Sequence, residues 1–141
     1  MYNLTVQHFF EAAHQLPDTE DLITKGCANL HGHTYHIEVG IEASKNTRNG
    51  MVVDFKAIKD IINILDHRFI NDVFKEQEFC KLNYNVEGPP QKGEILQSTA
   101  ENIARFIFER IDIDLKITPA YVKVGEGYKG PERTSYVTYK E

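Results

Sequence analysis

The chain has 141 residues, of which 41% are hydrophobic and 26% are charged, and its formal net charge is −5 at pH 7. These values are typical of a soluble chain that buries its own core, so we expect one domain over residues 1–141. The acidic balance argues against a general nucleic-acid or membrane-surface binder, and no apolar run approaches the ~20 residues of a membrane span.

The chain opens on a strand pattern rather than on a secretory signal, so we expect a cytoplasmic protein. Its two cysteines, Cys27 and Cys80, are then expected to stay reduced. In a reduced setting, a cysteine close to histidines is typical of a metal-binding or catalytic site.

Two segments alternate between apolar and polar residues, which predicts strands at residues 3–14 and 31–43. His14 shares its parity with the apolar residues of the first segment. His31 and His33 share one face of the second segment, because successive side chains of a strand point to opposite faces. The two predicted strands are separated by a polar loop over residues 15–30.

Helical spacing of apolar residues follows in the middle of the chain. Asp54 is a suitable N-cap for the first helix, and Ser98 to Glu101 match a capping box before the last one. The predicted helical residues are 55–65, one or two further turns within 70–80, and 100–111. A long polar loop at residues 83–97 separates the last two.

The C-terminal part predicts a hairpin with strands at 121–124 and 135–139, joined by a glycine-rich segment. The predicted order is therefore β-β-α-α-β-β. Two hairpins flanking two helices predict an α+β domain, with a four-stranded antiparallel sheet and the helices on one face.

Three histidines are the candidate metal ligands. His14, His31 and His33 would hold a zinc ion and leave a fourth position open, as in catalytic zinc sites. The pattern alone leaves an alternative open, in which His14 and His33 are partly buried core residues and His31 is a turn residue. Cys27 has three readings: a fourth zinc ligand, a reactive thiolate, or an inert small hydrophobe.

Two further sites are candidates for chemistry. Asp66 follows the predicted helix at its C-terminal end, where an acid is disfavoured by the helix dipole, and it precedes His67, whose imidazole it can orient. Glu126 lies between Gly125 and Gly127 at a strand end, where glycines permit close approach of a ligand to the backbone. Its carboxylate can accept hydrogen bonds from an aminopyrimidine edge, although its position alone favours a solvated turn acid.

Six stretches of the chain, in order, resemble the 6-pyruvoyltetrahydropterin synthase / 6-carboxytetrahydropterin synthase family. The stretches are Phe10-Glu11-Ala12-Ala13-His14, Cys27-x-x-x-His31-Gly32-His33, Met51-Val52-Val53-Asp54-Phe55, Leu65-Asp66-His67, Ser98-Thr99-Ala100-Glu101-Asn102 and Val122-Lys123-Val124-x-Glu126. The resemblance implies the tunnelling fold (T-fold), whose protomers join in a ring around a β-barrel. It also implies a homohexamer made of two trimers, with active sites at subunit interfaces.

The resemblance further assigns a role to each candidate residue. It implies that the zinc ligands are His14, His31 and His33. It implies that Cys27 is the catalytic thiol, and that Asp66 and His67, contributed by an adjacent subunit, complete a proton relay. Glu126 would anchor the pterin ring, although this chain has Gly125-Glu126-Gly127 where the family usually has a Glu-Thr context.

The family acts on 7,8-dihydroneopterin triphosphate. The three residues between Cys27 and His31 resemble the carboxytetrahydropterin branch, which serves queuosine biosynthesis and releases acetaldehyde and triphosphate. The alternatives are the pyruvoyl branch, which eliminates triphosphate from the same substrate, and a non-catalytic zinc-stabilised binding module with Cys27 as fourth ligand.

Overall fold

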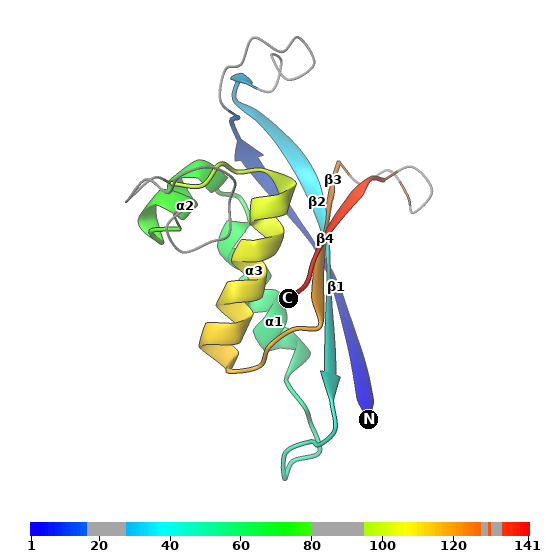
Figure 1. The fold of residues 1–141 in the computed structure, drawn as a ribbon. Helices are drawn as coiled ribbons and strands as arrows, with labels where there is room; N and C mark the ends of the chain where they lie inside the picture. The colour runs from blue at the N-terminus through cyan, green and yellow to red at the C-terminus, as the bar shows by residue number, and fades with distance from the viewer. Residues whose placement is uncertain (17–27, 80–94, 128–129, 131–133) are drawn as a thin grey trace.

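The computed structural model describes residues 1–16, 28–79, 95–127, 130 and 134–141. Their elements, in chain order, are β1 (Tyr2–His14), β2 (His31–Ala43), α1 (Phe55–Ile62), the 3₁₀ helix η2 (Asn63–Leu65), α2 (Ile70–Glu76), α3 (Ala100–Leu115), β3 (Tyr121–Glu126) and β4 (Tyr136–Tyr139). The strands form one antiparallel sheet in the order β1-β2-β3-β4 (Figure 1). The predicted α+β architecture is confirmed.

Strands β1 and β2 are long and pair along their whole length. Their register runs from Tyr2 opposite Ala43 to His14 opposite His31. Alternate residues of β1 are buried, as the period-two pattern predicted, and His14 lies on the same face as the buried Val6 and Phe10. The register therefore brings two candidate ligands together at one end of the hairpin.

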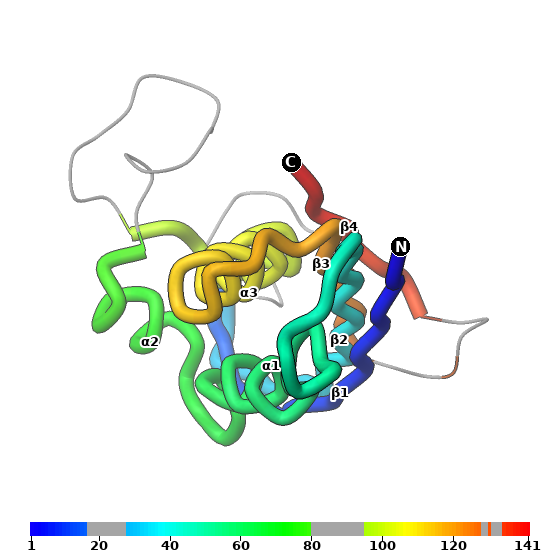
Figure 2. Tube along the Cα trace, turned by 90° about the horizontal axis from the view of Figure 1, so that it is seen from below, coloured from blue at the N-terminus to red at the C-terminus, as the bar shows by residue number. Residues whose placement is uncertain are grey.

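The helices cover one face of this sheet, which Figures 1 and 2 show from two directions. Helix α1 begins after Asp54, whose carboxylate accepts a hydrogen bond from the backbone N–H of Lys56 at 2.9 Å, so the predicted N-cap is confirmed. The core between helices and sheet holds buried residues from β1, β2, β3 and all the helices, including Phe10, Ile37 and Ile62, and Tyr139 of β4 packs against it. Among the described residues, no helix has the length and apolarity required to span a membrane.

The start of α3 differs from the predicted capping box by one residue. Thr99, rather than Ser98, is the N-cap, and its hydroxyl accepts a hydrogen bond from the backbone N–H of Asn102 at 3.3 Å. The helix also continues beyond residue 111 to Leu115, because Leu115 extends the apolar face by one turn and packs against the core. It ends at Lys116, which has a left-handed backbone conformation.

The segment after η2 runs alongside the last part of β1. The backbone N–H of His67 donates to the carbonyl of Glu11 at 2.6 Å, and the N–H of Ala13 donates to the carbonyl of Arg68 at 3.0 Å. The carboxylate of Asp66 accepts from the N–H of Glu11 at 3.0 Å. This backbone pairing places Asp66 and His67 beside the strand that carries His14.

Candidate metal centre

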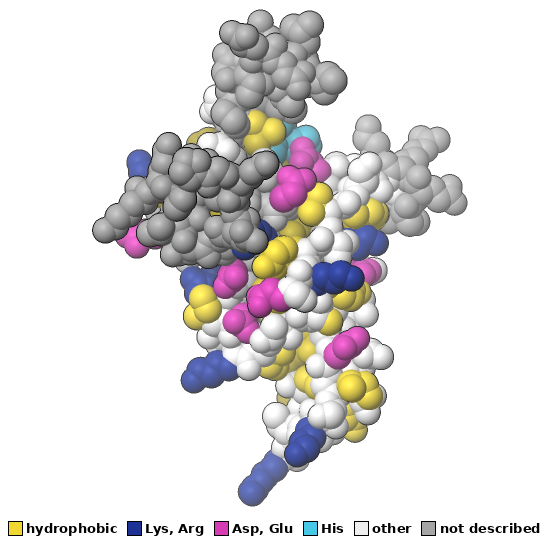
Figure 3. Space-filling view, viewed as in Figure 1, with side chains coloured by type: hydrophobic (Ala, Val, Ile, Leu, Met, Phe, Trp, Pro, Cys, Tyr) yellow, Lys and Arg dark blue, Asp and Glu magenta, His cyan; other side chains and the backbone are white. Residues whose placement is uncertain are grey.

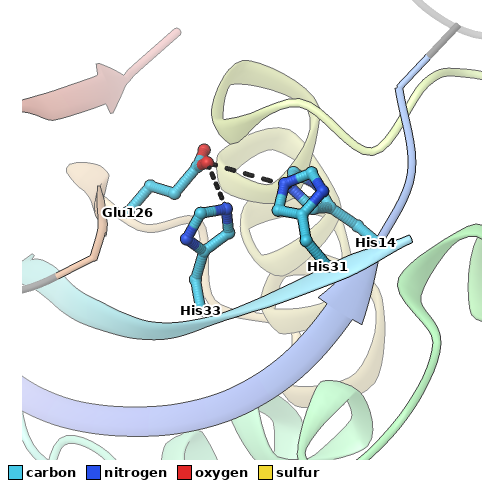
Figure 4. A group of neighbouring side chains, drawn as sticks. All are labelled: His14, His31, His33 and Glu126. Atoms are coloured by element: carbon cyan, nitrogen blue, oxygen red, sulfur yellow. Dashed lines mark hydrogen bonds and ion pairs between the residues drawn. The ribbon is translucent and has the colours of Figure 1, made fainter. Parts of the chain in front are cut away.

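Four side chains gather where β1 ends and β2 begins. The ligand atoms of His14, His31, His33 and Glu126 all lie within 4.8 Å of one another (Figure 4). His14 and His31 are direct cross-strand neighbours, His33 follows two residues later on the same face, and Glu126 is the last residue of β3. Histidine reaches the molecular surface at this end of the protein, beside acidic side chains (Figure 3).

Backbone carbonyls fix the orientation of two of the imidazoles. His14 donates its Nδ1 proton to the carbonyl of Ser98 at 2.7 Å, and His31 donates its Nδ1 proton to the carbonyl of Asn29 at 2.7 Å. In the neutral rings the Nε2 atoms therefore carry lone pairs. These two Nε2 atoms lie 2.9 Å apart, a distance at which two acceptors require a proton or a cation between them. A histidine that ligates a metal through Nε2 typically donates its Nδ1 proton to a carbonyl or carboxylate, as His14 and His31 do here.

Glu126 adds a negative charge to this group. Its Oε1 lies 2.7 Å from Nε2 of His33 and 3.7 Å from Nε2 of His14. The contact with His33 is close but lacks hydrogen-bond geometry, so it is electrostatic. Three imidazoles and a carboxylate are a donor set that suits zinc and other divalent transition metals.

Burial favours the neutral form of these histidines. Desolvation lowers the pKa of His14 and of His33, and the Glu126 carboxylate opposes this effect in both cases without overcoming it. The neighbouring imidazoles lower both pKa values further. Because neutral imidazole is the form that binds metals, this environment prepares the site for a cation.

A network behind His14 holds the carbonyl that orients it. The hydroxyl of Ser98 donates to Oδ1 of Asn71 at 2.9 Å. The Asn71 amide in turn donates to the carbonyl of Gln15 at 2.8 Å and its Oδ1 accepts from the N–H of Gln15 at 3.0 Å. The sequence did not predict Ser98 and Asn71 as site residues. The bond to His14 is made by a backbone carbonyl, and any residue type can supply one.

Asp66 and His67 are not members of the histidine group. The carboxylate of Asp66 lies 3.6 Å from Nε2 of His67, an ion-pair distance, and the imidazole is 78% exposed. His67 and His33 nevertheless line the same open cavity of about 610 Å³, together with Glu11, Thr34 and Arg68. Asp66, His14, His31 and Glu126 are not among the residues that line it. Cys27 lies outside the described residues.

Glu126 faces the core side of the sheet, with the buried Val122 and Val124 that precede it at alternate positions. This alternation was readable in the sequence and argues against a solvated turn acid. The local structure explains why both residues that flank Glu126 are glycines. A Cβ on Gly125 would lie 2.7 Å from the ring of Tyr136, and Gly127 has a φ of +70°.

The chain is similar in sequence and fold to known proteins over most of its length. The model of the family described as 6-pyruvoyl tetrahydropterin synthase matches residues 3–141. A Haemophilus influenzae protein named 6-carboxy-5,6,7,8-tetrahydropterin synthase is 32% identical, over 100% of both chains. A Synechocystis protein of the same name is 30% identical over 79% of this chain and 76% of its own.

Among solved structures, the 6-pyruvoyl tetrahydropterin synthase of Caenorhabditis elegans superposes with a TM-score of 0.57 at 25% identity, covering 100% of this chain and 97% of that one. Fold, site and family model point the same way: the chain belongs to the 6-pyruvoyl tetrahydropterin synthase family.

Proposed function

We propose that this protein is a zinc-dependent 6-carboxy-5,6,7,8-tetrahydropterin synthase. It converts 7,8-dihydroneopterin triphosphate to 6-carboxytetrahydropterin, acetaldehyde and triphosphate, a step of queuosine biosynthesis. The observation that carries the proposal is the convergence of the Nε2 atoms of His14 and His31, each oriented by a backbone carbonyl, beside His33. A Haemophilus influenzae relative that bears this name, matched over the full length of both chains, supports the choice of reaction.

The residues present fit zinc. His14, His31 and His33 would supply three neutral imidazoles, and three protein ligands with an open position are the usual form of catalytic zinc. When bound there, zinc would polarise the side-chain hydroxyls of the substrate and lower their pKa.

The other site residues would bind the substrate and move protons. Glu126 would accept hydrogen bonds from the pterin ring, which its place beside the histidines supports. Cys27 and His67 would act as acid and base, with Asp66 orienting the imidazole.

We further propose a homohexamer made of two trimers, in which Asp66 and His67 of one subunit serve the zinc site of its neighbour. The exposure of the His67 imidazole supports this arrangement, because an exposed side chain is free to reach an adjoining active site. Sedimentation velocity on the zinc-loaded protein tests the assembly, and a purely monomeric protein would contradict it.

The deciding experiment is incubation of the zinc-loaded protein with 7,8-dihydroneopterin triphosphate and identification of the products. Acetaldehyde together with 6-carboxytetrahydropterin is the expected result. A 6-pyruvoyl product without acetaldehyde would assign the chain to the other branch.

The thiol is tested separately. Cys27→Ala is expected to retain zinc and lose turnover, with Cys80→Ala as the matched control. If Cys27 is protected from thiol reagents while zinc is bound, and no turnover is found, the protein is instead a closed zinc-stabilised module.

A further inference from the structure

A buried hydroxyl beside the histidine group has no use in the chemistry described so far. The side chain of Tyr35 is fully buried, and its hydroxyl has no hydrogen-bond partner among the residues that the structure describes. Buried polar groups are nearly always paired, because an unpaired one loses its hydrogen bond to water without compensation. An unpaired hydroxyl next to a functional site therefore indicates a partner in another state of that site.

The ring of Tyr35 is held in place on several sides. It stacks on Phe10 with 4.9 Å between ring centroids. Its edges meet the rings of His14 and His33, with centroids at 6.0 Å and 5.6 Å. The position of the hydroxyl is thereby fixed relative to two of the three candidate ligands.

Tyr35 is also the direct cross-strand neighbour of Glu126. Opposite residues of an antiparallel pair project from the same face with their Cβ atoms roughly 5 Å apart. The Tyr35 ring and the Glu126 carboxylate therefore project from the same face of the sheet, beside His33.

Glu126 has two possible roles once a metal is present. Its Oε1 lies 2.7 Å from Nε2 of His33, so the carboxylate is within reach of any cation held by the histidines. If it bound that cation, the site would have four protein ligands and no open position, the form of a structural zinc site. If it stayed off the cation, it would remain available to the substrate.

We propose that Tyr35 is a positioning residue that decides between these roles. When a metal occupies the histidine group, the Tyr35 hydroxyl donates a hydrogen bond to the Glu126 carboxylate and draws it away from the metal. The fourth metal position stays open, and the carboxylate is held in one orientation. The kinetic consequence of this arrangement rests on the proposed function, whereas the effect on metal coordination does not.

Cobalt(II) bound to the purified protein is the probe, because its visible absorption reports the number and geometry of its ligands. Four proteins are compared: the native chain, Tyr35→Phe, Glu126→Gln and the double variant. The native and Glu126→Gln spectra are expected to agree, because Glu126 does not bind the metal in either. Tyr35→Phe is expected to shift the spectrum through carboxylate binding, and the added Glu126→Gln is expected to reverse that shift.

Two results would overturn the inference: a Tyr35→Phe spectrum identical to the native one, or a shift that persists in the double variant. The stability of the metal-free protein separates positioning from packing. Tyr35→Phe removes one oxygen that makes no hydrogen bond there, so the free energy of unfolding should stay the same or rise. A loss of metal-free stability would indicate a structural hydroxyl and would also contradict the inference.

With zinc and the pterin triphosphate, Tyr35→Phe is expected to raise KM at least tenfold with a smaller change in kcat, because the anchoring carboxylate is no longer held. This effect should vanish in the Glu126→Gln background. An unchanged KM beside active native enzyme overturns the kinetic part of the inference. If the native enzyme shows no turnover, the proposed function fails, and the cobalt spectra still test the role of Tyr35.

Discussion

The Nε2 atoms of His14 and His31 lie 2.9 Å apart at the end of the β1–β2 hairpin. Both rings have their Nδ1 proton committed to a backbone carbonyl, so two lone pairs face each other. Such a pair is unfavourable without a cation or proton between the nitrogens, and a metal ion relieves it. The arrangement of the two rings therefore favours binding of a cation between them.

The first prediction concerns the ligands. His14→Ala is expected to weaken zinc binding by roughly 100-fold or more, since even the loss of a residue that only supports a ligand costs about 10- to 100-fold. His8→Ala is the matched control, because His8 lies on the same face of β1 but contacts Asn63 instead, at 2.9 Å. Competition with a chromogenic chelator measures both affinities. Equal losses in the two variants would contradict the site.

The second prediction concerns the network behind His14. Asn71→Ala removes the side chain that joins Ser98 to Gln15, so the carbonyl that orients His14 is released. Zinc affinity is expected to fall about tenfold while the three ligands remain. Asn63→Ala provides the comparison, because it removes an asparagine side chain that contacts a β1 histidine outside the site, His8, at 2.9 Å. A similar zinc affinity in the two variants would mean that this network does not support the ligand.

The third prediction concerns pH. The pKa values of His14 and His33 are lowered by burial, whereas the unfolded chain titrates near the ordinary histidine value of about 6.5. The unfolded state therefore binds protons first as the pH falls. The free energy of unfolding of the metal-free protein should be at its full value above pH 6.5, and should decrease as the pH falls from there through the lowered pKa values.

Urea unfolding of EDTA-treated protein at a series of pH values measures this slope. His14→Ala should flatten it; part of the slope should remain, because burial also lowers the pKa values of His33 and His36. A stability that rises on acidification would contradict the prediction. Zinc binding should weaken in the same direction, because protons compete with the metal for the imidazoles.

Much of this arrangement was predictable from the sequence, because period-two and helical patterns are strong over long elements. The strands predicted at 3–14 and 31–43 are β1 and β2 within one residue, and their parity placed the three histidines on one face. Local signals were less precise. The capping box was misplaced by one residue because Ser98 uses its hydroxyl on Asn71 instead of the helix.

Tertiary contacts account for what the sequence did not predict. Nothing in the pattern indicates that Ser98 and Asn29 would direct their carbonyls at His14 and His31. Nor does it indicate that the Tyr35 hydroxyl would be buried with no hydrogen-bond partner in the part of the chain that the structure describes. The roles of Cys27, Asp66, His67 and Glu126 stay predictions, as do the zinc itself and the hexamer.

The last prediction concerns His67, whose backbone and side chain have separate effects. Its φ of +55° is a left-handed conformation, which costs roughly 1–2 kcal/mol for a residue with a Cβ. His67→Gly relieves that strain but increases the entropy of the unfolded chain, so the free energy of unfolding should change by less than about 1 kcal/mol. The exposed imidazole contributes little to packing.

Under the proposed function the same substitution removes a proton-transfer group, so kcat should fall by roughly 10²- to 10⁴-fold. Glu78→Gly is the matched control, because Glu78, two residues after α2, has a φ of +53° and does not line the cavity of His67. It should show the same small change in stability and native turnover. If His67→Gly also kept native turnover, His67 would have no part in proton transfer, and its left-handed turn would serve only to align the 66–69 segment with β1.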